Sequence, residues 1–174
     1  ASIMADPTPA EVQRYIAPSL PVPGKPPRYY QEIAINRVLG AILSVQRRVL
    51  VTMATGTGKT AAFTLPLLQR LLPHASPSPS PARHPVRALI LAPTRELAIQ
   101  VHENLATYAK YTSFRTICVY GGVDIKPQIE AIRKGVEFLV ATPGRLLDLV
   151  EQKCLNFQSV QALVLDEADR MLDM

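Results

Sequence analysis

A glycine-rich stretch ending in lysine and threonine gives the clearest indication of chemistry in this sequence. It occupies residues 53–60 (Met-Ala-Thr-Gly-Thr-Gly-Lys-Thr), between an apolar run and a helix-forming segment. Glycines allow backbone N–H groups to close around phosphate oxygens, and the start of a helix adds partial positive charge. We expect Lys59 to reach the β- and γ-phosphates of a nucleotide, and the Thr60 hydroxyl to ligate Mg²⁺. The predicted nucleotide-binding residues are Thr55, Gly56, Thr57, Gly58, Lys59 and Thr60.

An acidic cluster follows the last apolar run of the chain. It reads Asp-Glu-Ala-Asp over residues 166–169, directly after residues 162–165. Carboxylates at the end of a strand suit a magnesium–nucleotide complex, because one can hold the metal and another can polarise water. We predict that Asp166 binds Mg²⁺ and that Glu167 orients the attacking water. The alternative is an acidic first turn of a helix, which also favours Asp and Glu.

The elements that must position these residues alternate along the chain. Continuous apolar runs predict strands at 49–52, 88–92, 116–120, 137–141 and 162–165. Helical spacing of apolar residues predicts helices at 28–43, 61–72, 95–108, 127–134 and 145–152. This alternation is typical of an α/β fold with a parallel sheet covered by helices on both faces. Every strand would then end at the same edge of the sheet, which brings the glycine-rich and acidic stretches together.

Two proline-rich segments lie outside this pattern. Residues 1–27 contain seven prolines and are expected to form an extended lead-in, with room for a helix only around 10–16. Residues 28–174 would form the folded domain. Within it, residues 73–85 carry three Ser-Pro pairs and are predicted to be a flexible surface linker.

Composition sets the broad class of the protein. The chain has 174 residues, of which 48% are apolar, and a formal net charge of +5, which favours an anionic partner. Cys118 and Cys154 match no metal or redox spacing, so we expect buried or inert thiols. No apolar run approaches about 18 residues and no export signal opens the chain, so we expect a cytoplasmic protein with no membrane partner.

Four motifs resemble those of DEAD-box RNA helicases, in the same order and at similar distances. They are residues 93–100 (Pro-Thr-Arg-Glu-Leu-Ala-Ile-Gln), 121–122 (Gly-Gly), 142–145 (Thr-Pro-Gly-Arg) and 166–169 (Asp-Glu-Ala-Asp). The resemblance covers about residues 57–174 and implies a RecA-like P-loop NTPase core, the first domain of a two-domain motor. It also implies nucleic-acid contacts, made by groups at the strand tips that grip a sugar-phosphate backbone. The residues concerned are Pro93, Thr94, Arg95, Gly121, Gly122, Thr142, Pro143, Gly144 and Arg145.

The preceding part of the chain resembles a different family. Residues 26–60 look like the motor subunit of type I restriction enzymes, which has an Arg-Tyr-Tyr-Gln lead-in and a Met-Ala-Thr-Gly-Thr-Gly-Lys-Thr loop. Gln31 would still read adenine through its amide. Because both families share the glycine-rich loop, our hypothesis is a chimera of two superfamily 2 helicases joined near residues 56–60.

The sequence ends at Met174, soon after the acidic cluster. The resemblance implies that a Ser-Ala-Thr strand would follow and would lie between the strand of the phosphate loop and that of the acidic motif. We therefore expect a sheet lacking its final strand or strands. Direct pairing of the two flanking strands, a strand-swapped homodimer, or recruitment of the N-terminal segment would compensate, and we predict an oligomer or a rearranged sheet.

Three functions remain open from the sequence. The first is an ATP- and Mg²⁺-binding helicase core whose hydrolysis is coupled to RNA remodelling in the full motor. Turnover by this chain alone would be weak or absent, with a deficit of about 10³–10⁵ when arginine fingers are missing. The second is a DNA translocase fragment of restriction type. The third is a non-catalytic fragment that binds nucleotide or nucleic acid, or only self-associates.

Overall fold

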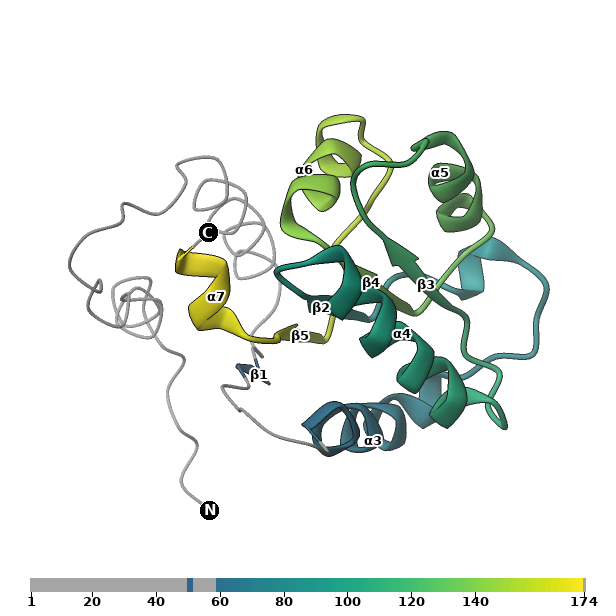
Figure 1. The fold of residues 1–174 in the computed structure, drawn as a ribbon. Coiled ribbons are helices and arrows are strands. Elements are labelled where there is room, and N and C mark those ends of the chain that lie inside the picture. The colour runs from purple at the N-terminus through teal and green to yellow at the C-terminus, as the bar shows by residue number, and fades with distance from the viewer. Residues whose placement is uncertain (1–49, 52–58, 174) are drawn as a thin grey trace, which may run out of the picture.

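The computed structural model describes residues 50–51 and 59–173 (Figure 1). Predictions for residues 1–27, the helix at 28–43, Gln31 and the loop residues 55–58 lie outside the described residues. The strands are β1 (Leu50–Val51), β2 (Ala88–Leu91), β3 (Thr116–Val119), β4 (Phe138–Ala141) and β5 (Ala162–Leu165). The helices are α3 (Lys59–Leu71), α4 (Arg95–Ala109), α5 (Lys126–Arg133), α6 (Pro143–Glu151) and α7 (Ala168–Asp173), with 3-10 turns at Leu72–His74 and Pro81–Arg83.

The strands form one parallel sheet with the order β1-β5-β2-β4-β3. Its central strands are buried on both faces, because a parallel sheet is covered by the helices that connect its strands. The predicted α/β class with a parallel sheet is confirmed. Strand β1 pairs directly with β5, with Leu50 opposite Val164 and Val51 opposite Leu165. Of the three arrangements expected for this part of the sheet, the structure shows direct pairing.

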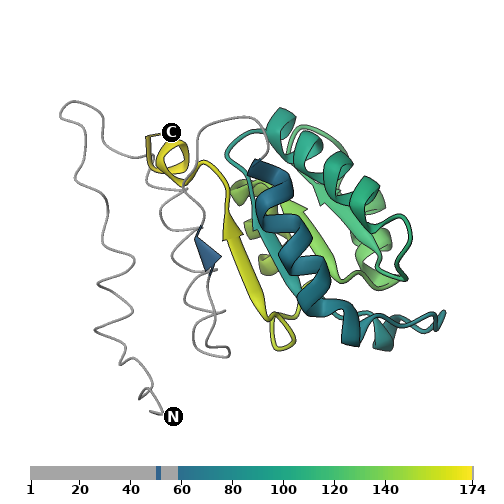
Figure 2. The same ribbon diagram turned by 90° about the horizontal axis from the view of Figure 1, so that it is seen from below.

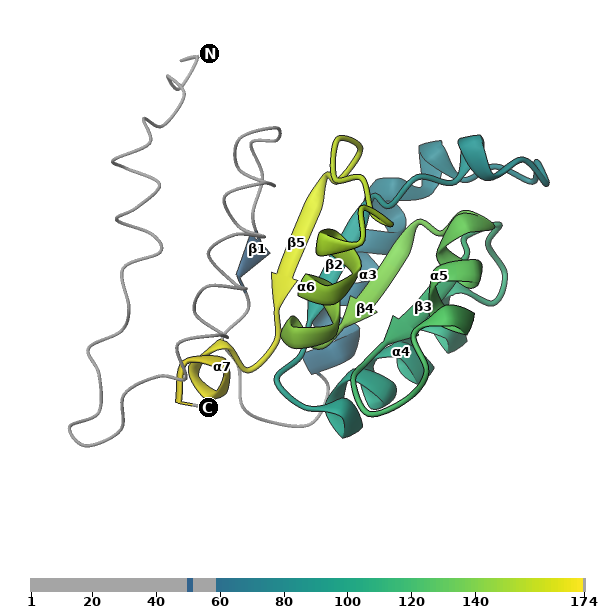
Figure 3. The ribbon, with the colours of Figure 1, turned by 90° about the horizontal axis from the view of Figure 1, so that it is seen from above.

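The two faces of the sheet carry separate apolar cores. Figures 2 and 3 view the sheet from opposite sides, with α3 and α4 in front in one and α5 and α6 in front in the other. Alternate residues of β2 face alternate layers: Ile90 packs with α3 and α4, and Leu91 packs with α5 and α6. The α3 and α4 layer contributes Phe63, Leu67, Leu71, Val101 and Leu105, and the opposite layer contributes Ile132, Leu146 and Leu149. Helices on both faces are therefore confirmed.

Among the described residues, the observed element boundaries lie within two residues of the predicted ones, and strand β5 matches its prediction at both ends. Helix α6 begins at Pro143, two residues before the predicted start at Arg145, because proline is well suited to the first helical position. A short helix, α7, begins within the acidic cluster at Ala168, in line with the alternative given for this cluster, an acidic first turn of a helix. In the described part of the chain, no helix is long and apolar enough to cross a membrane.

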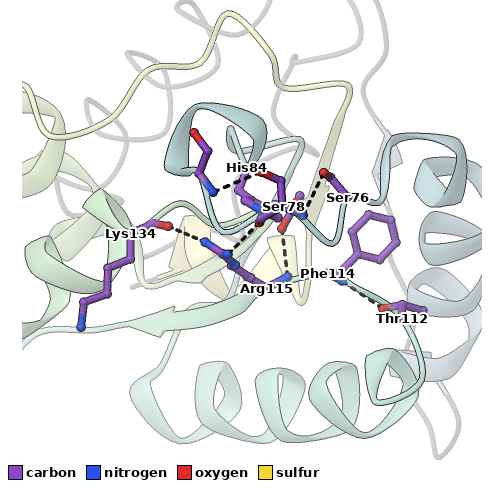
Figure 4. Close-up of polar contacts among 9 residues, drawn as sticks. Ser76, Ser78, His84, Thr112, Phe114, Arg115 and Lys134 are labelled. Carbon is purple, nitrogen blue, oxygen red and sulfur yellow. Dashed lines mark hydrogen bonds and ion pairs between the residues drawn. The ribbon is translucent and has the colours of Figure 1, made fainter.

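The proline- and serine-rich segment 73–85 is attached to the amino-terminal edge of the sheet. The carbonyl oxygen of Ser78 accepts hydrogen bonds from His84 Nε2 at 2.6 Å and from the Arg115 guanidinium at 3.1 Å (Figure 4). His84 Nδ1 is in turn hydrogen-bonded to the carboxyl group of Glu137, and both side chains are buried. These contacts hold the segment at two points, while its flexibility between them stays a prediction.

The two cysteines are reduced and half-buried. Burial raises the pKa of the Cys118 thiol to about 12, so this thiol stays protonated at neutral pH. Cys154 Sγ lies 3.4 Å from the carbonyl oxygen of Gln152. Cys118 therefore has the chemistry of an inert side chain, as expected.

His102 on α4 gives the fold a dependence on pH. Burial lowers its pKa, against smaller opposing effects of a hydrogen bond to Thr116 and of the charge on Glu103. The folded state then binds fewer protons than the unfolded state, so stability is full above about pH 6.5 and falls as the pH drops below it. Between about pH 7.5 and 5.5, the free energy of unfolding should fall less for His102→Gln than for the unsubstituted chain. Urea unfolding at the two pH values measures this difference. Equal losses in the two proteins would contradict this.

Candidate functional site

The carboxyl ends of the strands lie at one edge of the sheet, where the arrowheads point in Figure 3. The acidic cluster begins there, directly after β5. Asp166 is 5% exposed, and its backbone N–H donates to the carbonyl oxygen of Leu91 at 2.9 Å. Glu167 has φ of +49°, a conformation that turns the chain sharply into α7. Its carboxylate accepts from Arg170 at 2.7 Å. The cluster is therefore a sharp strand-to-helix turn with a buried first carboxyl group.

The start of α3 reaches the same edge. Lys59 is the first residue of this helix and Thr60 is the second. Thr60 is half-buried, and its carbonyl oxygen accepts a hydrogen bond from the Thr64 hydroxyl. Val51 of β1 lies opposite Leu165 of β5, so Asp166 is the first residue after this last pair of the two strands. A hydroxyl and a carboxylate are oxygen ligands that Mg²⁺ accepts, so the residues present fit a magnesium–nucleotide complex.

The Pro-Thr-Arg-Glu-Leu-Ala-Ile-Gln motif (residues 93–100) forms the loop after β2 and the start of α4. Thr94 caps the helix, with its hydroxyl oxygen accepting from the Leu97 N–H at 3.2 Å. Pro93 before it is buried, whereas Arg95 after it is exposed. The Arg95 guanidinium lies over the ring of Tyr120, 4.9 Å from the ring centroid. This contact connects residues 93–100 with the loop after β3.

That loop contains Gly121 and Gly122. Gly122 has φ of +81°, which glycine adopts without strain. A Cβ atom built on either glycine would meet no atom within 4 Å, so the backbone here is open on the side where side chains would lie. Two side chains from other elements support the loop. Gln128 Nε2 donates to the Tyr120 carbonyl oxygen at 3.2 Å, and an Arg145 nitrogen donates to the Val123 carbonyl oxygen at 2.8 Å.

The Thr-Pro-Gly-Arg motif corrects one detail of the predicted site. Only Thr142 precedes the helix, whereas Pro143, Gly144 and Arg145 form the first turn of α6. The Arg145 side chain is 8% exposed, and Nη1 has no hydrogen-bond partner among the described residues. Its Nε lies 3.5 Å from the Asp148 carboxylate. Arg145 is therefore a buried cation that supports the Gly-Gly loop and keeps unused donor capacity, not an arginine extended from a strand tip.

The edge thus brings together two kinds of chemistry. Asp166 after β5 and Lys59 and Thr60 at the start of α3 are the residues predicted for metal and nucleotide, and the ends of β2, β3 and β4 carry cations, hydroxyls and open backbone. Sequence reasoning missed Tyr120 and Gln128, for which no ligand is expected. The Tyr120 ring contacts the Arg95 guanidinium, and Gln128 donates to the backbone of Tyr120. Tyr120 precedes the Gly-Gly pair directly, and this adjacency was the available signal.

Comparison with known families agrees with this arrangement. The sequence pattern described as DEAD/DEAH box helicase matches residues 28–174, which is most of the chain. The match includes the glycine-rich loop, the four later motifs and the sheet that positions them.

Individual relatives match a shorter part. The chain is 49% identical over 121 residues to ATP-dependent RNA helicase dbp2 of Schizosaccharomyces pombe, covering 70% of this chain and 22% of the relative. It is 46% identical over 120 residues to DEAD-box ATP-dependent RNA helicase 20 of Oryza sativa subsp. japonica, covering 69% and 24%. It is 48% identical over 120 residues to DEAD-box ATP-dependent RNA helicase CshA of Bacillus anthracis, covering 69% and 21%. The matched part spans less than a quarter of the length of these relatives.

Proposed function

The chain belongs to the DEAD/DEAH box helicase family, and on that premise we propose that it is the ATP-binding first RecA-like core of an RNA helicase. The observation that carries the proposal is the meeting of two sites at one sheet edge. Lys59 and Thr60 begin α3 at that edge, and the buried Asp166 follows β5 at the same edge. Arg95, Arg145 and the Gly-Gly loop follow along the same edge.

The nucleotide side would work through charge and position. Lys59 would bind the β- and γ-phosphates, and Thr60 with Asp166 would hold Mg²⁺, which neutralises developing charge on the phosphates. Glu167 would orient the attacking water. Its ion pair with Arg170 fixes the carboxylate at the turn, so water alignment would share this group with Arg170.

The groups at the ends of β2, β3 and β4 would bind the sugar-phosphate backbone of RNA. Arg95 presents an exposed guanidinium, and the N-terminus of α4 adds partial positive charge near it. Arg145 is buried and holds the loop after β3, whose Gly121 and Gly122 backbone is open. These are groups that bind phosphate and sugar without reading bases, which fits a motor that remodels RNA of many sequences.

Replacing Lys59 tests the nucleotide site. We expect Lys59→Ala to weaken ATP binding by about 10–100-fold, because a hydrogen bond to a charged group is worth about 1.5–3 kcal/mol. Binding of a fluorescent ATP analogue, measured with Mg²⁺, would show this. Lys134→Ala is the matched control, because it removes the same charge from an exposed residue at the opposite edge.

Turnover with and without nucleic acid separates the candidate functions. RNA-stimulated ATP hydrolysis that Lys59→Ala removes supports the helicase core. Stimulation by DNA alone would support a DNA translocase, and binding without turnover would support a non-catalytic fragment. Equal ATP binding by Lys59→Ala, Lys134→Ala and the unsubstituted chain would overturn the proposed nucleotide site.

The origin of residues 26–60 is a separate proposal. We propose that they derive from a type I restriction motor and join a DEAD-box sequence near the phosphate loop. The Tyr29-Tyr30-Gln31 lead-in and Met53 support this, and the RNA helicase relatives match only 69–70% of the chain. Aligning residues 1–56 and 61–174 separately tests the idea. One natural relative that matches both parts at similar identity would contradict it.

A further inference from the structure

The ring of Tyr120 lies between two motifs of the proposed RNA site. It follows β3 directly, is half-buried, and carries the Arg95 guanidinium over its face at 4.9 Å from the centroid. A cation over an aromatic face is attracted by the ring quadrupole, and arginine also stacks on it. Arg95 is exposed, so without the ring its long side chain would be free to sample many rotamers.

The backbone that carries this ring is itself fixed from two sides. On one side, Gln128 Nε2 donates to the carbonyl oxygen of Tyr120 at 3.2 Å. On the other, the buried Arg145 donates to the carbonyl oxygen of Val123 at 2.8 Å. These bonds come from α5 and α6, so two helices fix the loop after β3 and the position of its ring. The Gly121 and Gly122 backbone between the two bonds stays open to a ligand.

From this arrangement we propose that Tyr120 is a positioning residue for RNA binding: its ring holds the Arg95 guanidinium in the orientation that meets an RNA phosphate. The inference rests on the proposed function, because it assumes that Arg95 contacts RNA. Holding the guanidinium before RNA arrives removes part of the ordering cost of binding. The ring itself needs no contact with RNA, and the tyrosine hydroxyl takes no part.

The expected effects follow from the energy of a cation over a ring. At an exposed site this interaction is worth a factor of about 2–5 in affinity. We expect Tyr120→Leu to weaken RNA binding by about 2–5-fold and Tyr120→Phe to leave it unchanged. We expect Arg95→Ala to weaken binding more and to lower the salt dependence by about 0.7 in slope, the value for one phosphate contact with a single strand.

The experiment measures binding of a short fluorescein-labelled oligouridylate to the whole chain by fluorescence anisotropy, across a series of salt concentrations. The variants are Arg95→Ala, Tyr120→Leu, Tyr120→Phe and the double variant Arg95→Ala with Tyr120→Leu. Tyr111→Leu is the matched control, because Tyr111 also carries a cation over its ring, from Lys110 at 5.7 Å, but lies at the opposite edge. Thermal unfolding monitors folding, and Tyr120→Met is the second variant if Tyr120→Leu is unstable.

Each outcome bears on the inference. It is supported if Tyr120→Leu weakens binding, Tyr120→Phe does not, and Tyr120→Leu has no further effect in the Arg95→Ala background. It is overturned, with the proposed RNA site intact, if Arg95→Ala weakens binding but Tyr120→Leu does not. It is also overturned if the two effects multiply, since the ring would then act on RNA directly. If Arg95→Ala binds as tightly as the unsubstituted chain, the RNA site proposed at this edge fails and the inference fails with it.

Discussion

Glu137→Gln is expected to lower the free energy of unfolding by about 3–5 kcal/mol, the cost of breaking a buried pair by removing one partner. Glu137 is fully buried, and its two carboxyl oxygens have different partners. One is hydrogen-bonded to His84 Nδ1, and the other accepts from the Arg115 N–H at 2.9 Å. His84 Nε2 faces the Ser78 carbonyl oxygen and Nδ1 faces the Glu137 carboxylate, which both only accept, so both ring nitrogens act as donors in this arrangement.

The physical reason is that glutamine cannot serve both partners. Its amide oxygen would accept one hydrogen bond, and its NH₂ group would face the other donor. A buried donor without an acceptor costs the full desolvation penalty of that group. Urea unfolding followed by circular dichroism measures the loss. The matched control is Glu130→Gln, because Glu130 is exposed on α5 and should change stability by less than about 0.5 kcal/mol.

A double substitution tests whether the loss of stability comes from leaving one member of the buried pair without its partner. Replacing both His84 and Glu137 by leucine removes the two polar side chains together, and buried pairs are often replaced by apolar residues at little cost. We expect the double variant to be more stable than either single leucine variant. If Glu137→Gln matched Glu130→Gln in stability, the buried pair would contribute nothing to the fold.

The sheet could be predicted from the sequence because its signals are local. A run such as residues 88–92 is apolar throughout, which indicates a strand buried on both faces, and the helices between such runs impose parallel connections. The direct pairing of β1 with β5 was one of three expectations, because strand order depends on contacts between distant segments. The His84 and Glu137 pair was not predicted for the same reason, since 53 residues separate its members.

The sequence predicts the residue types of the candidate site but carries little information on its geometry. The spacing of Lys59, Thr60 and Asp166 indicates phosphate and magnesium chemistry, because few other arrangements use these groups after strands. Nothing in the sequence indicated that Arg145 is buried and bonded to the backbone of Val123. Such a bond depends on where α6 lies against the loop after β3, and no local pattern encodes that distance.

Gly135→Ala is expected to lower the free energy of unfolding by about 2–5 kcal/mol. Gly135 follows α5 with φ of +89°, where a residue with a Cβ atom pays about 1–2 kcal/mol. The added Cβ would also lie 2.7 Å from His84 Cβ and 3.0 Å from the Pro81 backbone. Crowding of this kind in a packed region costs about 1–3 kcal/mol. Urea unfolding measures the sum.

Gly144→Ala is the matched control for this substitution. Gly144 lies in the first turn of α6, and a Cβ there would meet no atom within 4 Å. Alanine is the better helix former, so stability should stay the same or rise by up to about 1 kcal/mol. A stable Gly135→Ala protein would mean that the turn at Pro81–Arg83 moves away from the sheet at little cost. Segment 73–85 would then be held through Ser78 and Arg115, and the close approach of His84 to Gly135 would not be a requirement of the fold.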